Sequence, residues 1–133
     1  MTRILVIDDE RPIRTAIRRM LERAGYEVEE AEDGAVGMQR LRARPADLAI
    51  IDLLMPNMGG VETIREVQTQ FPQIKILAIS GGGRIGNLDP LLLVESLGVQ
   101  RALAKPFERR ELLAAVRELL MPENDGATLG KTK

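Results

Sequence analysis

Five strand-like segments alternate along this 133-residue chain with five helix-like segments. The predicted strands are Ile4–Asp8, Tyr26–Ala31, Leu48–Asp52, Ile74–Ser80 and Val99–Ala104. Regular alternation requires right-handed crossovers between parallel strands, with helices on both faces of the sheet. The first, third and fourth segments are nearly continuous apolar runs, which is typical of strands buried on both faces, whereas the other two are mixed, as at sheet edges. The pattern therefore predicts an α/β fold with a five-stranded parallel sheet of order 2-1-3-4-5.

Helical periodicity is strongest in the first and last of the intervening segments. The first has its apolar residues at i, i+3, i+4, i+7, i+8 and i+11, namely Ile13, Ala16, Ile17, Met20, Leu21 and Ala24. Pro12 suits the first turn of that helix and Gly25 suits its end. We expect the second helix at about Ala35–Ala43 and the fourth over Leu91–Leu97. The third and fifth helices are predicted from the apolar positions Val61, Ile64 and Val67, and Leu112, Leu113, Val116, Leu119 and Leu120.

The length and composition are those of one globular domain: 44% of the residues are hydrophobic and 29% are charged. Residues 122–133 have no apolar periodicity, so we expect a folded domain over residues 1–121 and a flexible tail over residues 122–133. The net charge of −1 provides no basic excess for nucleic acid. No apolar run approaches the roughly 18 residues that span a bilayer. We therefore expect neither nucleic acid nor membrane as a partner, and a cytoplasmic location.

The chain contains no cysteine and no histidine. Their absence excludes disulfides, thiolate metal sites, thiol catalysis and histidine acid–base chemistry. Any chemistry must therefore use carboxylates, hydroxyls and amines.

Polar residues stand at the carboxyl ends of the predicted strands, where open parallel sheets form their sites. Asp8 and Asp9 follow the first strand and Asp52 ends the third, while Ser80 ends the fourth and Lys105 follows the fifth. Neighbouring carboxylates remain ionised together only around a cation, and oxygen ligands without nitrogen or sulfur favour Mg²⁺. Each residue alone has an ordinary structural explanation, such as helix capping or a solvated strand end. Their joint position at the ends of these strands favours a functional site.

These residues and their neighbours resemble the response regulator receiver family, the CheY-like superfamily of two-component signalling. The matching segments are Ile4–Glu10 (ILVIDDE), Asp52–Gly60 (DLLMPNMGG), Ser80-Gly81 and Lys105-Pro106-Phe107. The likeness covers about residues 3–120. It implies a phosphorylation-dependent switch, not an enzyme, with a CheY-like (βα)5 fold. Such a switch accepts a phosphoryl group from a sensor histidine kinase or phosphotransfer protein and signals by contact with a downstream protein target.

The resemblance assigns a metal site and a phosphoacceptor. Asp52 would accept the phosphoryl group and form an acyl phosphate. Asp9 and Asp52 would bind Mg²⁺ directly, together with the backbone carbonyl of Leu54. Asp8 would act mostly through metal-bound water.

The resemblance also assigns residues that contact the phosphoryl group. Lys105 would pair with a phosphoryl oxygen, and the Ser80 hydroxyl would hydrogen-bond to the group. The Lys105–Pro106 bond would be cis, as is typical of the family.

Three features depart from the usual receiver pattern or extend it. Ala102 stands three residues before the lysine, where receivers usually carry a tyrosine or phenylalanine that swings inward. The glycine-rich segment at residues 81–86 is equally consistent with a loop that changes order on phosphorylation and with a plain turn. The run Leu91–Val94 exceeds what one helix face buries, which suggests a partner or homodimer surface near the fourth helix beside ordinary core packing.

Other functions remain open on the residues alone. A phosphatase of the haloacid-dehalogenase type would need Asp-X-Asp after the first strand, where this chain has adjacent acids. A flavodoxin-like cofactor binder would need a phosphate-cradling loop at that position, and an acidic loop repels phosphate. A pseudo-receiver that only binds partners would not need the complete acidic set and Lys105.

Overall fold

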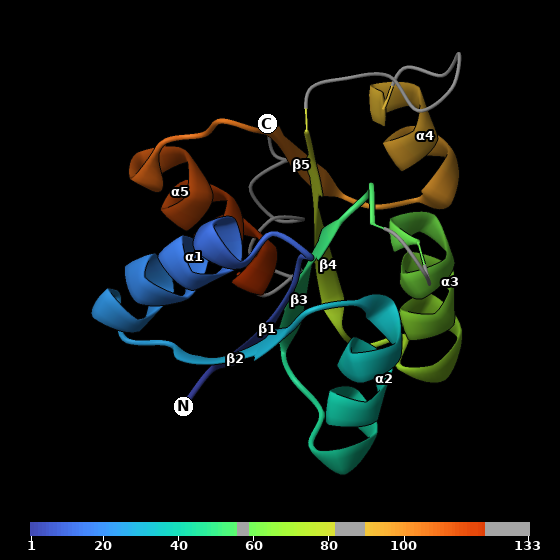
Figure 1. Ribbon diagram of the computed structural model, residues 1–133, viewed down its shortest axis with the longest axis horizontal. Helices are drawn as coiled ribbons and strands as arrows, with labels where there is room; N and C mark the ends of the chain where they lie inside the picture. The colour runs from blue at the N-terminus through green and yellow to red at the C-terminus, as the bar shows by residue number, and fades with distance from the viewer. Residues whose placement is uncertain (56–58, 82–89, 122–133) are drawn as a thin grey trace, which may run out of the picture.

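The computed structural model describes residues 1–55, 59–81 and 90–121. Its centre is a five-stranded parallel sheet of order β2-β1-β3-β4-β5 (Figure 1). The strands are β1 (Arg3–Ile7), β2 (Glu27–Ala31), β3 (Leu48–Asp52), β4 (Lys75–Ser80) and β5 (Arg101–Ala104). The predicted fold class and strand order are confirmed, and no strand boundary differs from its prediction by more than two residues.

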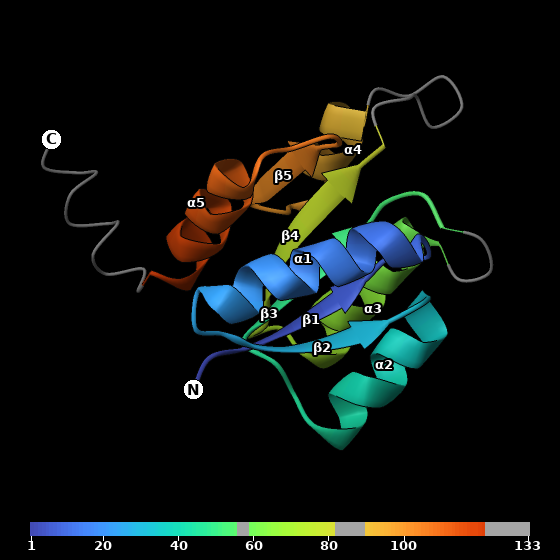
Figure 2. The same cartoon turned by 60° about the vertical axis from the view of Figure 1, so that its left-hand side comes forward.

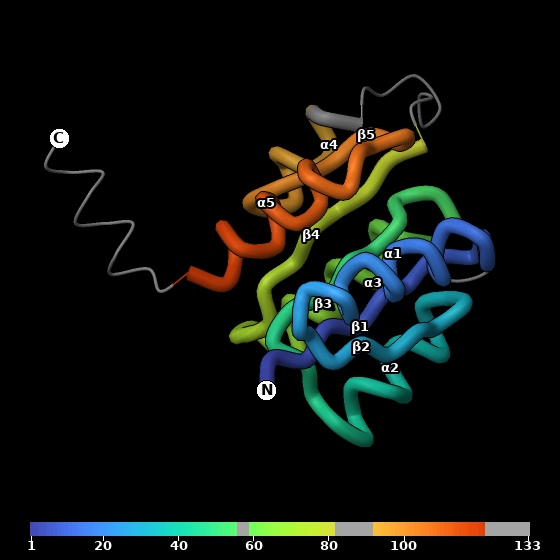
Figure 3. Tube along the Cα trace, turned by 90° about the vertical axis from the view of Figure 1, so that its left-hand side faces the viewer, coloured from blue at the N-terminus to red at the C-terminus, as the bar shows by residue number. Residues whose placement is uncertain are grey.

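Five helices connect and cover these strands. They are α1 (Arg11–Arg23), α2 (Gly34–Ala43), α3 (Gly60–Gln70), α4 (Pro90–Leu97) and α5 (Arg109–Leu120). Helices α1 and α5 lie side by side on one face of the sheet, while α2, α3 and α4 cover the other (Figure 1). Figure 3 shows α1 and α5 in front of the strands from the side. Within the described residues, no helix combines the length and the apolar character that a membrane span requires.

The sheet separates two hydrophobic cores, and each central strand contributes alternate residues to both. Leu5 and Ile7 of β1 pack with α2 and α3, whereas Ile4 and Val6 pack with α1 and α5. This two-sided burial explains why β1, β3 and β4 are continuous apolar runs in the sequence.

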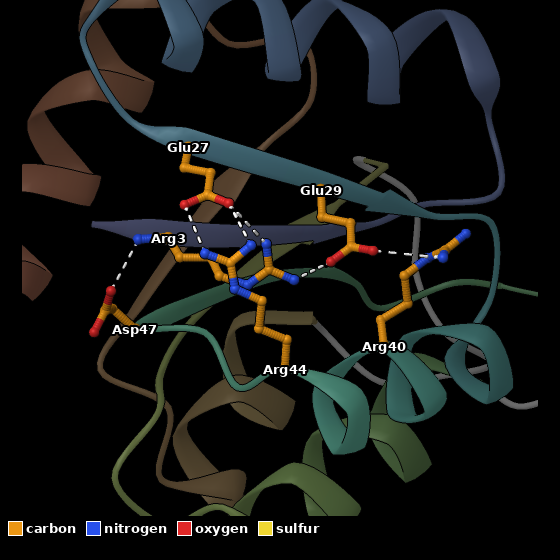
Figure 4. Close-up of polar contacts among 6 residues, drawn as sticks. All are labelled: Arg3, Glu27, Glu29, Arg40, Arg44 and Asp47. Carbon is orange, nitrogen blue, oxygen red and sulfur yellow. Dashed lines mark hydrogen bonds and ion pairs between the residues drawn. The ribbon is translucent and has the colours of Figure 1, made fainter. Parts of the chain in front are cut away.

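Strand β2 lies at one edge of the sheet. Arginines neutralise the charges of its glutamates Glu27 and Glu29, as Figure 4 shows. Arg3 on β1, whose side chain is 10% exposed, pairs with both Glu27 and Glu29. From α2, Arg44 Nη1 lies 2.8 Å from Glu27 Oε2, and Arg40 Nη1 lies 3.4 Å from Glu29 Oε2. Charged side chains along an edge strand oppose pairing with a second sheet. Glu27 and Glu29, which make this strand mixed in the sequence, are thus partners of a buried arginine.

Replacing Arg3 with methionine is expected to lower the free energy of unfolding by about 1–3 kcal/mol, because two half-buried carboxylates lose their most buried partner. Arg44→Met is the matched control. Its side chain is 62% exposed and shares Glu27, so we expect a loss of about 0.5 kcal/mol or less. Urea unfolding of the two variants at pH 7 measures both values. Equal losses would show that burial of Arg3 does not strengthen its ion pairs.

Some sequence-based hypotheses lie outside the described residues. They are the tail over residues 122–133 and most of the glycine-rich segment, residues 82–86. Within α4, Leu92 is 59% exposed, while Val94 and Leu97 pack into the core.

Candidate functional site

The predicted site residues occupy one edge of the sheet. The carboxyl ends of the strands point in a common direction, toward the right in Figure 2. Asp52 and Ser80 are the last residues of β3 and β4, and Asp8 and Lys105 directly follow β1 and β5. Parallel strands with short connections thus bring four distant positions together.

Lys105 is the centre of this cluster, and its side chain is only 11% exposed. Its Nζ lies 2.9 Å from Glu10 Oε1, 3.1 Å from Asp8 Oδ2 and 3.2 Å from Asp52 Oδ2. The backbone N–H of Lys105 donates to the Ser80 carbonyl at 2.7 Å, which fixes the chain beside the end of β4. The Lys105–Pro106 bond is cis, as expected.

The charge of Lys105 is maintained by its neighbours. Burial lowers the pKa of the ammonium group. Hydrogen bonds to the carboxylates of Glu10 and Asp8, together with the charge of Asp52, outweigh that effect, so the pKa lies above its ordinary value. Lys105 is therefore a fixed positive charge at neutral pH.

Asp52 is 3% exposed, and this burial controls its ionisation. Burial and then the nearby charge of Asp8 raise the pKa of Asp52 from 3.8 to about 6, against the opposing effect of Lys105. The backbone N–H of Leu54 donates to Asp52 Oδ1 at 3.2 Å. A carboxylate in this position is ionised at pH 7 but is poorly solvated, which favours binding of a cation or attack on an electrophile.

The raised pKa predicts how the stability of the metal-free protein depends on pH. Between pH 4 and 6 the folded state retains the Asp52 proton that the unfolded chain has lost, so this group makes stability fall as pH rises through that interval. Asp52→Asn removes the effect, and we expect this variant to be about 1–3 kcal/mol more stable than the parent at pH 7.

Urea unfolding with a chelator, at pH 4 and at pH 7, measures the difference between the parent and Asp52→Asn. Taking the difference cancels the titration of other carboxylates. A difference that stays the same at both pH values would contradict the raised pKa.

Asp8 is fully buried, and its two carboxylate oxygens have different partners. Its Oδ1 accepts the backbone N–H of Glu10 at 2.9 Å. Its Oδ2 lies 3.1 Å from Lys105 Nζ and forms an ion pair with it. A buried carboxylate oxygen close to other acids also suits a hard cation.

Three acids form a group that could hold such a cation. One carboxylate oxygen from each of Asp8, Glu10 and Asp52 lies within 4.8 Å of the others. Among the described residues, Asp9 is exposed and is not a member of this group. Its predicted role as a direct metal ligand stays a prediction.

Glu10 was not among the candidates from the sequence. The chain bends at Asp9, and the backbone N–H of Glu10 donates to Asp8 Oδ1 at 2.9 Å. From this position the Glu10 carboxylate reaches Lys105 Nζ at 2.9 Å. The third acid directly after Asp8-Asp9 is the signal that could have identified Glu10.

Ser80 and Leu54 border the cluster. Ser80 is the last residue of β4 and is 8% exposed. Leu54 is 45% exposed and contributes its backbone N–H to Asp52. The proposed contacts of the Ser80 hydroxyl and of the Leu54 carbonyl stay predictions.

The start of α3 is packed tightly against the end of β3. A Cβ atom on Gly60 would collide with the backbone of Asp52 and Leu53. Glycine at this position therefore allows the helix to begin directly against the site.

An apolar groove of about 620 Å³ opens beside the acidic cluster. Ile13, Ala16 and Met20 of α1 form one wall, and Phe107 forms part of the other. Glu10, Gly81 and Lys105 line both the groove and the site edge, so a molecule bound in the groove would lie next to the charged residues.

Comparisons with known proteins agree with this geometry. Residues 4–117 match the family model described as the response regulator receiver domain. The response regulator MprA of Mycobacterium avium is 34% identical over 98% of this chain, and the chain spans 57% of that protein's length. The CAI-1 autoinducer sensor kinase/phosphatase CqsS of Vibrio cholerae is 36% identical over 86% of this chain and 17% of its own length.

Solved structures show the same fold. The chemotaxis protein CheY4 of Vibrio cholerae superimposes with a TM-score of 0.81 at 30% identity, covering 90% of this chain and 99% of that protein. A CheY-like receiver domain protein from Methanospirillum hungatei gives a TM-score of 0.80 at 28% identity, covering 89% and 92% of the two chains. With a family match across nearly all of the described residues, the chain belongs to the response regulator receiver domain family, the phosphorylation-dependent switches of two-component signalling.

Proposed function

We propose that Asp52 accepts a phosphoryl group from a partner histidine kinase or phosphotransfer protein, and that the phosphorylated chain signals by protein contact. The observation that carries this proposal is the buried Asp52 carboxylate, 3.2 Å from the Lys105 ammonium and grouped with Asp8 at one sheet edge. An ionised carboxylate beside a fixed cation is suited to attack phosphorus while the new negative charge is neutralised.

The donor set at this edge fits Mg²⁺. The carboxylates of Asp52 and Asp8, with Asp9 and the Leu54 carbonyl from the family resemblance, would hold the ion. When bound, the ion neutralises charge on the phosphoryl oxygens. The grouping of carboxylate oxygens of Asp8, Glu10 and Asp52 within 4.8 Å of one another supports this assignment.

In the phosphotransfer reaction the protein mainly positions the Asp52 carboxylate and supplies positive charge beside the phosphoryl group. An oxygen of Asp52 forms a bond to phosphorus as the phosphorus–nitrogen bond of the donor's phosphohistidine breaks, and the electron pair of that bond leaves with the imidazole. Lys105 pairs with a phosphoryl oxygen, and the Ser80 hydroxyl donates to another. These contacts exist only in the phosphorylated state, so they shift a two-state equilibrium.

The change of conformation cannot be transmitted by an inward-swinging tyrosine or phenylalanine, as is usual in receivers. Position 102 is an alanine that packs against the core shared with α3 and α4. A methyl group has no second position into which it could swing, so the output must use another element. Leu92 of α4, 59% exposed, is one surface through which a downstream target or a second copy of the chain would bind.

The apolar groove supports a protein as the phosphodonor. A donor that carries phosphohistidine to Asp52 must cover the adjoining surface, and the nearest apolar area is the wall formed by Ile13, Ala16 and Met20. A small donor would not need this wall.

We further infer that residues 1–121 are the receiver domain and that residues 122–133 are a tail. We also infer that the protein acts in the cytoplasm without binding nucleic acid.

Phosphotransfer from a panel of autophosphorylated histidine kinases tests the proposal. We expect one or a few kinases to transfer label within seconds to minutes, with Mg²⁺ present, and the rest to transfer slowly. Failure of every kinase and of acetyl phosphate would favour the pseudo-receiver. Steady release of phosphate from many phosphate esters would favour the phosphatase.

A further inference from the structure

Glu10 stands at the entrance of the site and makes the shortest of the three carboxylate contacts of the Lys105 ammonium. Its Oε1 lies 2.9 Å from Lys105 Nζ, and its side chain is 55% exposed, whereas Asp8 and Asp52 are buried. The backbone of Glu10 is fixed, because its N–H donates to Asp8 Oδ1 and its carbonyl accepts the N–H of Arg14. The side chain does not cap α1. Among the described residues, its carboxylate contacts Lys105.

The position of Lys105 creates a competition. A phosphoryl group on Asp52 Oδ2 would lie next to Lys105 Nζ, which is 3.2 Å from that oxygen and is already paired with Glu10. An acyl phosphate carries close to two negative charges, so it attracts the ammonium more strongly than the Asp52 carboxylate does and repels the Glu10 carboxylate.

We propose that Glu10 holds the Lys105 ammonium in the unphosphorylated protein and opposes loading of the phosphoryl group, which must displace it. The inference rests on the proposed function of Asp52. Glu10 is then a positioning residue that acts on the phosphoryl group through Lys105. It lowers the affinity of the site for the phosphoryl group. The exposure of Glu10 allows its release, since its carboxylate can be solvated as soon as Lys105 turns to the phosphoryl oxygen.

Beryllofluoride, which mimics the phosphoryl group on aspartate, provides the test. At saturating Mg²⁺, Glu10→Gln is expected to bind beryllofluoride about two- to fivefold more tightly than the parent, the scale of one partly exposed ion pair. Fluorine NMR titration measures the affinity. Phosphorylation by acetyl phosphate is expected to accelerate by a similar factor.

Two variants and one separate measurement make the result specific. Glu32→Gln removes an exposed acid after β2 that has no described contact with Lys105, so its affinity should match that of the parent if net charge alone is unimportant. Asp52→Asn should bind no beryllofluoride. Mg²⁺ affinity, measured without beryllofluoride, tests whether Glu10 is instead a metal ligand.

The outcomes separate the inference from the proposed function. Equal affinity of Glu10→Gln and the parent overturns the inference and leaves Asp52 as the acceptor. An equal gain in Glu32→Gln also overturns it, in favour of a general charge effect. Weaker beryllofluoride binding by Glu10→Gln, with a loss of tenfold or more in Mg²⁺ affinity, would make Glu10 a metal ligand. Absence of binding by the parent protein overturns the proposed function and the inference with it.

Discussion

Asp52→Asn is expected to abolish phosphoryl uptake from both a histidine kinase and acetyl phosphate, with a fall on the order of 10³-fold or more, the scale of losing a catalytic nucleophile. The amide cannot attack phosphorus and contributes no negative charge to a metal ion.

The matched control is Asp47→Asn. Asp47 precedes β3 at the opposite end of the sheet, where its Oδ2 accepts the backbone N–H of Arg3 at 2.8 Å. An asparagine oxygen can accept the same bond, so we expect uptake within twofold of the parent. Intact-protein mass spectrometry gives the fraction that carries the added phosphoryl mass. Normal labelling of Asp52→Asn would place the acceptor elsewhere.

Lys105→Met is the second change with a large expected effect. It should slow phosphoryl uptake by about 10²-fold, which is typical when one group that stabilises developing negative charge is removed. The buried acids Asp8 and Asp52 lose their shared cation, so the pKa of Asp52 should rise above about 6. Carbon-detected NMR titration of the Asp52 carboxyl group in the metal-free protein measures this rise.

Lys75→Met serves as the control for Lys105→Met, because Lys75 begins β4 at the other end of the sheet. It should change neither the uptake rate nor the pKa of Asp52. Uptake by Lys105→Met at the parent rate would show that the metal ion alone neutralises the phosphoryl group. A pKa of Asp52 that does not move would show that the ion pair at 3.2 Å contributes little in solution.

The fold was predictable because a strand that is buried on both faces is a continuous apolar run in the sequence. Ile4–Ile7 and Leu48–Ile51 are continuous apolar runs, since alternate residues face different cores. The weak pattern of α2 also has a physical reason. Gly37 faces the sheet at a position where a Cβ would collide with the side chain of Ile7. The helix therefore has a glycine there, and not the large apolar residue that would mark its buried face in the sequence.

The site was predictable in outline but not in its side-chain pairing. Strand-end positions correctly brought Asp8, Asp52 and Lys105 together, because strand order determines which ends are neighbours. The pairing of Glu10 with Lys105 depends on the local backbone after β1 and on the reach of two long side chains. Residue type and spacing in the sequence determine neither the backbone path nor the reach of these side chains. The burial of Arg3 among glutamates was also not predictable, because it follows from the register of β1 with β2.

The arrangement on which this account depends is an acidic site that holds a divalent ion while Asp52 carries the phosphoryl group. A crystal structure of the protein with magnesium and beryllofluoride measures it directly. We predict beryllium on an Asp52 carboxylate oxygen, fluorine atoms near Lys105 Nζ and the Ser80 hydroxyl, and the ion bound by acids that follow β1. An Asp52 carboxylate free of beryllium, with the ion bound elsewhere, would contradict the account.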